Sequence, residues 1–585
     1  MSDPAQSGFV HLRVRSAYSL LEGAIKAGKI GRMAADAGMP AVAVADRANL
    51  FGALEFSQTA KEAGVQPIVA CALPVLGIGG QVNARWAKTP TVVLLAQNET
   101  GWLNLCALSS AAYLDAGEMA EPGVHWSQVA ARSDGLILLS GGPCGPIDPL
   151  FVQGKTEEAH AALDALREAF GDRFYVELQR HGLDDERRAE RGLVAWAYDN
   201  DVPLVATNDV YYAKAAQAKS HDALLCIADG AFTGQEERRR VTGEHWFKSA
   251  EAMRALFADL PEACDNTLLL TEMIGSYDEV FKHVDRMPQF DVPEGETQES
   301  WLRKKLQEGL DEKFGPNPPK EVLERLETEL SVIEPLGFSS YFLIVSDICS
   351  AARSMGVPVG PGRGSAAGSL VAYLTGIIAI NPLEHGLLFE RFLNPERVNP
   401  PDIDLDFDDR QRDKVIDYVT YKYGAEYTSQ VNTFGKIKAK AAVKDANRIL
   451  GYPFSLGDKI TKAMPPDVMG KGVPLDKIFD PSHERYGEGQ EFRQLVADNP
   501  DVAKVVDTAR GLEGLIRGTG VHACAFILSS APLLDLVPMH KRDKDGMIIA
   551  GFAYPQLEEM GLMKMDFLGL RNLGIMDHCI KIIKD

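Results

Sequence analysis

The sequence predicts an α/β protein of several domains, and three observations support this fold class. The chain has 585 residues, which is too long for a single hydrophobic core, so we expect roughly two to four domains. Short apolar runs alternate with helical stretches through residues 1–278, a pattern typical of a parallel sheet that can close into a barrel. A run of acids alternating with apolar residues at 402–408 marks a second region in the other half of the chain.

Composition and charge narrow the class of protein. No run of about 18 apolar residues occurs, and residues 1–10 lack the basic start and apolar centre of a signal peptide. We therefore expect a cytoplasmic protein without a membrane span. The eight cysteines are scattered without a C-x-x-C pair, which argues against structural zinc and disulfides. The net charge of −21 does not exclude nucleic-acid binding, because phosphate contacts depend on local basic patches.

The prediction of a barrel-like domain depends on a series of apolar runs and on the acids that follow them. Buried strands of a parallel sheet are continuous apolar runs, and functional side chains lie at their carboxyl ends. Those ends carry Asp46, Glu177 with His181, and Asp209. The predicted strands are 41–45, 66–70, 91–95, 135–139, 174–178 and 202–206, separated by helices such as 26–37 and 156–170.

This half resembles the PHP (polymerase and histidinol phosphatase) domain in segments 11–16, 45–52 and 206–211. Active members of that family bind a metal cluster through histidines and acids. A neutral imidazole can ligate a metal whereas a guanidinium cannot, so we expect a scaffold without a metal cluster; a residual metal phosphoesterase is the alternative. The changed ligand positions are Arg13, Arg15, Arg47, Ala72, Gly142 and Tyr211, and the retained ones are Asp46, His181 and Asp209.

A linker and several helices are predicted next. Residues 279–299 carry prolines and few apolar pairs, and 315–319 is a strong helix breaker. Apolar residues at helical spacing predict helices over 299–314, 320–334 and 341–355.

A glycine-rich turn follows at residues 356–369. We expect a short strand, the turn and then an apolar helix at 370–376, because glycines let the backbone approach a phosphate and helix N-termini favour anions. Arg363 adds charge and Ser365 adds a hydroxyl. Most such turns are only turns, and this one matches neither the P-loop nor the dinucleotide fingerprint, so its interpretation depends on the acids downstream.

The central motif is the acidic run that begins after Pro400 and Pro401. On a strand, Asp402, Asp404 and Asp406 point to one face and repel each other. A chain tolerates this where hard cations such as magnesium neutralise the charge. The alternative is an acidic loop after two prolines, and the clean apolar alternation of Ile403, Leu405 and Phe407 argues against it.

A third acid on a separate strand would complete a nucleotidyl-transfer site with two metals. The candidate is Asp566 in the predicted strand 563–570, where Lys564 shares its face and could meet a phosphate. Taken alone, Asp566 is equally well explained as a turn or cap residue. Spacing also does not separate the pair Asp402/Asp404 from the pair Asp404/Asp406.

A basic stretch lies between these acids. Lys436, Lys440, Lys444 and Arg448 repeat every four residues, which stacks them on one helix face. A nucleic-acid backbone would offset their repulsion, and a solvated surface helix is the alternative. Residues 456–507 are predicted to form a small inserted helical subdomain, and His522 is assigned a structural role.

Together the motifs resemble the C-family replicative DNA polymerases of bacteria, the DNA polymerase III alpha subunits. The motifs are 361–365, 389–397, 401–407 and 564–570, and the resemblance covers essentially the whole chain. It implies a PHP-type (β/α) barrel, then an α+β palm of the polymerase-beta-like nucleotidyltransferase type with an inserted helical thumb. The implied limits are 1–278 for the PHP domain, 279–435 and 513–572 for the palm, 436–512 for the thumb, and 573–585 for the start of the fingers.

The resemblance implies the chemistry of a DNA-directed DNA polymerase, which transfers deoxynucleotides to a primer 3′-hydroxyl by two-metal catalysis. It favours Asp402, Asp404 and Asp566 as ligands of two magnesium ions, since the third acid of the run can be Asn in a related branch. The residues implied to hold the triphosphate are Gly364, Ser365, Arg391 and Lys564. The basic face supplies the expected DNA contacts, Lys436, Lys440, Lys444 and Arg448.

The implied partners are primer–template DNA, deoxynucleoside triphosphates and a separate proofreading exonuclease subunit. A sliding clamp and clamp loader are expected to bind C-terminal regions that family members carry beyond the point where this chain stops. The rest of the fingers, a clamp-binding region and an OB-fold are not expected within these residues, so one alternative is a catalytically incompetent DNA-binding fragment. A PHP-type phosphoesterase or 3′–5′ exonuclease is the other.

Overall fold

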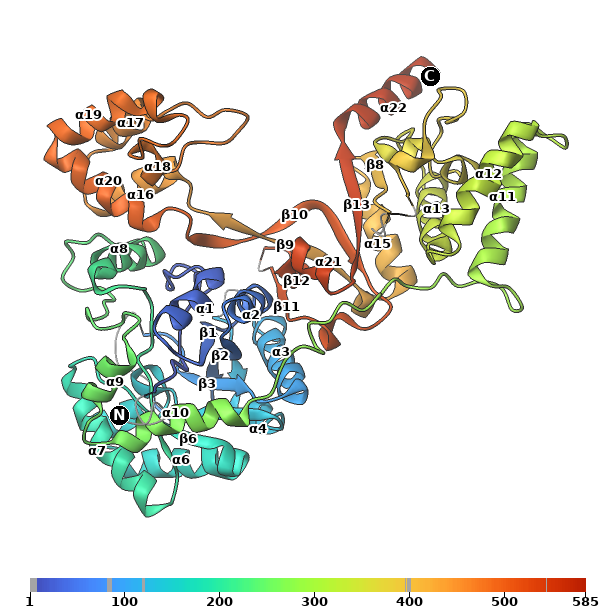
Figure 1. Cartoon of the computed structure of the whole chain (residues 1–585). Coiled ribbons are helices and arrows are strands. Elements are labelled where there is room, and N and C mark those ends of the chain that lie inside the picture. Colours follow the sequence, from blue (N-terminus) through green and yellow to red (C-terminus); the bar gives the residue numbers. More distant parts are fainter. Residues whose placement is uncertain are drawn as a thin grey trace. The chain divides into compact units, whose positions relative to one another are not determined.

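A computed structural model describes residues 8–80, 87–117, 121–394, 396, 401–542 and 544–584. The chain forms two compact units, each built from several segments (Figure 1). Unit 1 comprises Met1–Phe281, Phe434–Gly520 and Pro538–Asp543, and unit 2 comprises Lys282–Thr433, Val521–Val537 and Lys544–Asp585. No described helix combines the length and apolarity that crossing a membrane requires. Pro395 and Arg397 of the 389–397 motif, and Pro400 just before the acidic run, lie outside the described residues.

Unit 1 contains a mixed sheet whose strands are almost entirely buried. The order is β1-β2-β3-β5-β6-β7, and β4 pairs with β2. The pairs β1/β2, β5/β6 and β6/β7 are parallel, but β3 is antiparallel to both of its neighbours. The expectation of a parallel sheet is therefore wrong at β3. The strands are Ala41–Arg47, Gln66–Leu76, Thr91–Ala96, Val124–His125, Leu136–Leu139, Phe174–Leu178 and Leu204–Ala206 for β1 to β7.

The two ends of this sheet curl toward each other. Val14 forms isolated parallel bridges with Val44 of β1 and with Val210, which follows β7. Backbone bonds on both sides support these bridges, from the Ala45 N–H to the Val14 carbonyl (2.8 Å) and from the Val210 N–H to the Arg13 carbonyl (3.0 Å). The predicted barrel is thus present as a curled sheet joined through single bridges. This places Arg13 and Arg15 beside the carboxyl ends of several strands.

Helices cover this sheet and extend unit 1. Continuous burial explains why the strands are uniformly apolar rather than alternating. The helices that contact the sheet are α1 (Ala27–Asp36), α2 (Ala53–Glu62), α3 (Glu99–Leu114), α6 (Thr156–Phe170), α7 (Asp184–Asp199) and α10 (Pro261–Met273). Further elements of unit 1 are α4 (Trp126–Ala130), α5 (Asp148–Val152), α8 (Ala218–Asp229), α9 (Ala250–Leu256) and β11 (Met539–Lys541).

The segment between β9 and β10 is helical. Its helix α16 packs on α17, α20 and α8, all within unit 1. The crossing of α20 and α8 is close, because a Cβ atom at Gly511 would lie 2.3 Å from the Ser220 Oγ. These helices are α16 (Ala439–Ile449), α17 (Phe454–Ala463), α18 (Leu475–Ile478), α19 (Gln490–Asp498) and α20 (Pro500–Leu512).

A second mixed sheet has six strands in the order β11-β12-β9-β10-β13-β8, and most of its strands belong to unit 2. The pairs β12/β9 and β13/β8 are parallel, and β10/β13 is antiparallel. Strands β9 and β10 continue the chain from one unit into the other. The strands are β8 (Asp404–Asp408), β9 (Thr428–Lys436), β10 (Ile516–Leu528), β12 (Ile548–Ala553) and β13 (Met563–Leu570).

Helices form one core with this sheet. Phe342, Leu370, Phe407 and Phe567 are buried in it, and the Phe407 and Phe567 rings meet edge to face with centroids 5.7 Å apart. Side chains alternate along a strand, so the apolar face of β8 packs here while its acids face the other way. The helices of unit 2 are α11 (Gln298–Phe314), α12 (Lys320–Ile333), α13 (Ser339–Ser354), α14 (Leu370–Leu374), α15 (Arg412–Tyr423), α21 (Tyr554–Glu559) and α22 (Arg571–Lys584).

Candidate active site

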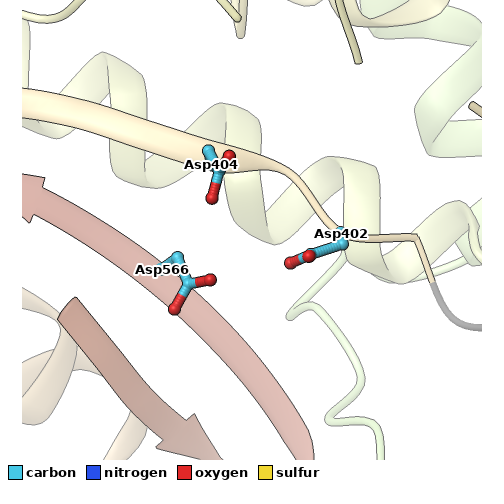
Figure 2. A group of neighbouring side chains, drawn as sticks. All are labelled: Asp402, Asp404 and Asp566. Atoms are coloured by element: carbon cyan, nitrogen blue, oxygen red, sulfur yellow. The ribbon is translucent and has the colours of Figure 1, made fainter. Parts of the chain in front are cut away.

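Three aspartates converge at the start of strand β8. Asp404 opens β8, and the parallel pairing of β8 with β13 places Asp566 directly opposite it. Asp402 lies two residues before the strand, in extended chain. One carboxylate oxygen from each of the three lies within 4.8 Å of the others (Figure 2). Within the described part of the chain, this is the one group of three potential metal ligands so close together.

The fold holds these acids from behind. The Tyr341 hydroxyl on α13 accepts a hydrogen bond of 3.0 Å from the Ile403 N–H, midway between Asp402 and Asp404, and Tyr341 is buried. On the other side, Asp566 is paired in register with Ala525 of β10, a small residue that leaves its carboxylate room. The buried Tyr341 hydroxyl therefore fixes the segment that carries Asp402 and Asp404, and the strand pairing fixes Asp566.

Two cationic side chains, Lys564 and Arg363, partly neutralise the three acids. The Lys564 Nζ lies 2.6 Å from the Asp566 Oδ2 and 3.9 Å from the Asp402 Oδ1. The Arg363 Nε donates to the Asp404 Oδ2 at 3.0 Å. Burial raises the pKa of Asp402, as do the charges of Asp566 and Asp404, while Lys564 opposes the shift. Three carboxylates face only two cationic side chains, which leaves the ionised cluster with a net negative charge.

The donor set fits a hard divalent cation. The buried Asp566 Oδ1 has no hydrogen-bond partner among the described residues, and an unsatisfied buried oxygen of this kind is costly. Carboxylate oxygens are the ligands that magnesium prefers. Asp402, Asp404 and Asp566 could hold such an ion. In the structure, Lys564 and Arg363 supply part of the positive charge that the ion would bring to these carboxylates.

The glycine-rich turn differs from its prediction in its strand and in its expected anion site. Val359 forms only a single bridge with Phe407, and the short helix η5 (Ser365–Gly368) follows Gly364, whose φ is +64°. The expected anion site at the start of helix 370–376 is not free. Buried Glu329 of α12 accepts hydrogen bonds there from the Leu370 N–H (2.8 Å) and the Val371 N–H (3.0 Å). A carboxylate of the protein already satisfies these helix-terminal amides.

The same carboxylate anchors a clamp on the turn. Arg325 donates from its Nε to Glu329 at 2.7 Å, and from its Nη2 to the Gly368 carbonyl (2.6 Å) and the Leu387 carbonyl (3.1 Å). Gly368 ends η5, and Leu387 precedes η6 (Phe389–Arg391), which lies against η5. This ion pair between Arg325 and buried Glu329 thus joins η5 and η6, which carry the predicted triphosphate residues Ser365 and Arg391. The Ser365 and Arg391 side chains are exposed and have no hydrogen-bond partner within the described ranges.

The predicted basic face is partly paired within unit 1. Lys436 is the last residue of β9 rather than part of α16, so the prediction of a four-residue stack on one helix is wrong there. Lys440 forms an ion pair with Asp467 (3.0 Å) and Lys444 with Asp458 (3.2 Å). Nearby carboxylates therefore offset much of the repulsion that the spacing suggested. Arg448 is exposed and has no ion-pair partner in the part of the chain that the structure describes.

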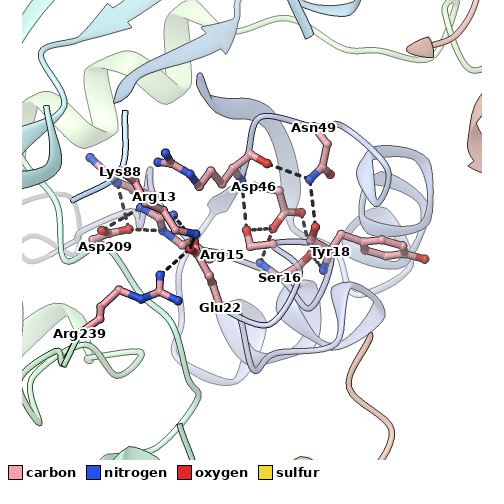
Figure 3. Close-up of polar contacts among 12 residues, drawn as sticks. Arg13, Arg15, Ser16, Tyr18, Glu22, Asp46, Asn49, Lys88, Asp209 and Arg239 are labelled. Atoms are coloured by element: carbon pink, nitrogen blue, oxygen red, sulfur yellow. Dashed lines mark hydrogen bonds and ion pairs between the residues drawn. The ribbon is translucent and has the colours of Figure 1, made fainter. Parts of the chain in front are cut away.

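Guanidinium groups occupy the positions in unit 1 where the resemblance to the PHP domain places metal ligands (Figure 3). Fully buried Arg13 bonds to Glu177 (3.0 Å) and Asp209 (3.0 Å), and Arg15 bonds to Asp209 (2.8 Å) and Glu22 (3.2 Å). Burial alone would raise the pKa of Asp209, but the two arginines hold it well below its usual range. Asp209 is thus fully engaged as the anion of an ion-pair network.

The other two retained ligand positions also have protein partners. Asp46 accepts hydrogen bonds from Ser16 and Ser19, each 2.6 Å from hydroxyl to carboxylate. The His181 ring lies 2.7 Å from a Glu186 carboxylate oxygen and 2.8 Å from the Asn208 carbonyl. Because both ring nitrogens of His181 are engaged, this side chain could ligate a metal only by giving up one of these contacts.

Sequence analysis missed Tyr341, Arg325 and Glu329. A signal for Glu329 was present, because it falls on the same helix face as Val322 and Leu326 of α12, all buried. A carboxylate on an apolar helix face must find donors inside the protein. The partner of such a residue is set by tertiary structure, and no spacing rule identifies it.

Fold and site together define a two-unit α/β protein with a cluster of three carboxylates in its second unit. Family comparison agrees: residues 11–181 match the PHP domain, and residues 300–569 match the bacterial DNA polymerase III alpha NTPase domain. The chain belongs to the family of bacterial DNA polymerase III alpha subunits.

Curated relatives named DNA polymerase III subunit alpha match over nearly the whole chain. The protein of Caulobacter vibrioides is 51% identical over 593 residues, covering 100% of this chain and 51% of that protein. Those of Saccharopolyspora erythraea and Mycobacterium tuberculosis CDC 1551 are 44% and 45% identical, covering 98% and 99% of this chain and 50% and 51% of those proteins. The chain spans about half the length of the curated relatives it matches.

Proposed function

We propose that this chain carries the nucleotidyl-transfer centre of a DNA-directed DNA polymerase that acts in replication. The observation that carries the proposal is the convergence of Asp402, Asp404 and Asp566, whose oxygens lie within 4.8 Å of one another. Two of these acids lie on paired parallel strands and the third precedes one of them. Relatives of this chain are named DNA polymerase III subunit alpha, and the reaction proposed here is the template-directed transfer of deoxynucleotides to a primer 3′-hydroxyl.

Asp402, Asp404 and Asp566 would hold the magnesium ions. Two ions held by these carboxylates would supply the activation of an attacking hydroxyl and the neutralisation of the leaving pyrophosphate. Lys564 stays protonated, because its hydrogen bond to Asp566 and the charge of Asp402 outweigh burial and raise its pKa. Its ammonium, 4.5 Å from the centre of the Tyr554 ring, can turn from Asp566 to a phosphate oxygen without losing its charge.

Gly364, Ser365, Arg391 and Lys564 are proposed to hold the triphosphate. A Cβ at Gly364 would meet no atom within 4 Å, so the backbone there is open to a ligand. The exposed Ser365 hydroxyl and Arg391 guanidinium lie on η5 and η6, which the Arg325–Glu329 pair ties together. Arginine binds phosphate oxygens in a fixed fork, which suits this role.

DNA binding is proposed for the basic residues of unit 1. Lys436, Lys440, Lys444 and Arg448 are at least partly exposed, and a phosphate backbone can replace the half-exposed partners of Lys440 and Lys444 at small cost. Because ion pairs fill the PHP ligand positions, proofreading is assigned to a separate exonuclease subunit. Contacts with a sliding clamp and clamp loader are assigned to parts of the relatives that this chain does not span.

Incorporation of a single templated nucleotide tests the proposal. The assay uses this chain, and the full gene product where that is longer, with magnesium and a primer–template. Asp566→Asn should abolish incorporation, whereas Asp535→Asn, a surface acid of the same unit, should not. Incorporation by Asp566→Asn at the wild-type rate would refute the assignment. Release of 3′ nucleotides that survives Asp566→Asn and is lost in His181→Ala would instead point to a phosphoesterase.

A further inference from the structure

The third acid of the central run, Asp406, has no role in the site described above. It lies on β8 two residues after Asp404 and is 8% exposed. Its Oδ1 has no hydrogen-bond partner among the described residues. The glycine-rich turn presses on it: the Gly360 N–H donates to the Asp406 carbonyl at 2.8 Å, and a Cβ at Gly360 would lie 2.6 Å from the Asp406 Cβ. A nearly buried carboxylate with an unused oxygen calls for an explanation.

Arg363 lies between Asp406 and Asp404. Its Nε donates to the Asp404 Oδ2 at 3.0 Å and is 4.0 Å from the Asp406 Oδ1. Its side chain is 46% exposed, so the guanidinium has room to move. It therefore bonds to a proposed metal ligand while an unoccupied acceptor lies within a short displacement.

A divalent cation and a guanidinium cannot both use the Asp404 carboxylate freely. They compete for the same oxygens and repel each other at short range. A protein without a second acceptor would lose the Arg363 interaction whenever the ion binds. Asp406 can accept the displaced guanidinium, and this satisfies an oxygen that is otherwise unpaired.

We propose that Asp406 is the alternative acceptor for Arg363, to which the guanidinium moves when a divalent cation occupies Asp404. This inference rests on the proposed function. Asp406 is then a positioning residue rather than a metal ligand, in agreement with its absence from the three-carboxylate group among the described residues. The move also keeps Arg363 next to the turn that carries Gly364 and Ser365.

A double-mutant cycle on manganese affinity tests the proposal without relying on catalysis. Binding of Mn²⁺ to the purified chain is followed by electron paramagnetic resonance. The proteins compared are wild type, Asp406→Asn, Arg363→Gln and the double variant, with thermal melting to confirm that each is folded. Asp409→Asn is the matched control, since Asp409 follows the same strand but pairs with Arg571 (3.5 Å).

The expected result is a coupling between the two residues. Asp406→Asn should weaken Mn²⁺ binding about five- to tenfold, because Arg363 then stays on Asp404 and competes with the ion. In the Arg363→Gln background the same substitution should change affinity less than about twofold, and Asp409→Asn should have no effect.

Two other outcomes would overturn the proposal, and they differ in meaning. If Asp406→Asn weakens binding equally in both backgrounds, or in neither, Asp406 does not act through Arg363, and the proposed function still stands. If wild type and Asp404→Asn bind Mn²⁺ alike, the three carboxylates are not a cation site. The proposed movement of Arg363 to Asp406 and the proposed function then fail together.

Discussion

Asp404 and Asp566 lie directly opposite each other on the parallel strands β8 and β13. The two strands are far apart in sequence, and the antiparallel partner β10 holds β13 from its other side. The candidate site therefore forms only when the second sheet is assembled. Residues that stabilise this strand pairing or the segment between Asp402 and Asp404 should affect cation binding even without touching the ion.

Tyr341→Phe should weaken the response to magnesium. The substitution removes the hydroxyl that accepts the Ile403 N–H and leaves a buried amide unpaired, at a cost of about 1–3 kcal/mol. The magnesium concentration for half-maximal primer extension should rise several-fold. Tyr418→Phe is the control, since it also loses a hydrogen bond, to Asp347 (2.8 Å), on another helix. Equal shifts in both variants would show that Tyr341 has no special role.

Glu329→Gln should raise the KM for the incoming nucleotide more than it lowers kcat. The neutral amide no longer balances Arg325, so the links to Gly368 and Leu387 loosen and the turn loses its fixed position. A three- to tenfold rise in KM, corresponding to about 1 kcal/mol, is expected. Arg303→Gln, which removes a surface pair with Glu334 (2.6 Å), should leave KM unchanged. A lower melting temperature with unchanged KM would indicate a purely structural role.

The local pattern of apolar residues was sufficient to predict an element where one of its faces is buried. The alternation of Ile403, Leu405 and Phe407 with the acids correctly predicted one apolar face, and all three are buried. The apolar runs of the first half also form strands as expected. These predictions succeeded because burial of a single face imposes its period on the sequence.

The predictions fail where tertiary contacts determine strand direction, the start of a helix or the partner of a polar group. Antiparallel β3 carries the same continuous apolar signal as its parallel neighbours, because it too is buried on both faces. Lys436 fits the spacing of a helix that begins only at Ala439. Glu329, distant in sequence, occupies the helix terminus that the glycine-rich turn seemed to offer a ligand. Each case depends on a partner that no local rule supplies.

Arg13→Gln should destabilise unit 1. Glu177 and Asp209 are buried, and the loss of their guanidinium partner leaves uncompensated charge, at a cost of about 3–5 kcal/mol. Hydrogen exchange of peptides that cover β6 and β7 should accelerate. Arg32→Gln removes only an exposed pair with Asp36 and should change stability by less than about 1 kcal/mol. Similar exchange in both variants would mean that the ion-pair network does not stabilise the sheet.

Arg448→Ala should lower DNA affinity and its salt dependence. An exposed arginine without an ion-pair partner among the described residues loses nothing when it binds a phosphate, so the slope of log K against log salt should fall by about 1. Lys444→Ala should have a smaller effect, because Lys444 must first leave Asp458. An unchanged slope in Arg448→Ala would exclude this residue from the DNA contact.

The most direct test of the three-carboxylate site is primer extension by the full-length protein with Asp404→Asn. The amide keeps the size of the side chain but loses the charge that binds the cation. We expect the rate of nucleotide addition to fall at least about a thousandfold, or about 4 kcal/mol, with DNA binding and thermal stability unchanged. Asp409→Asn should stay within about twofold of wild type. Extension by Asp404→Asn at the wild-type rate would contradict the account.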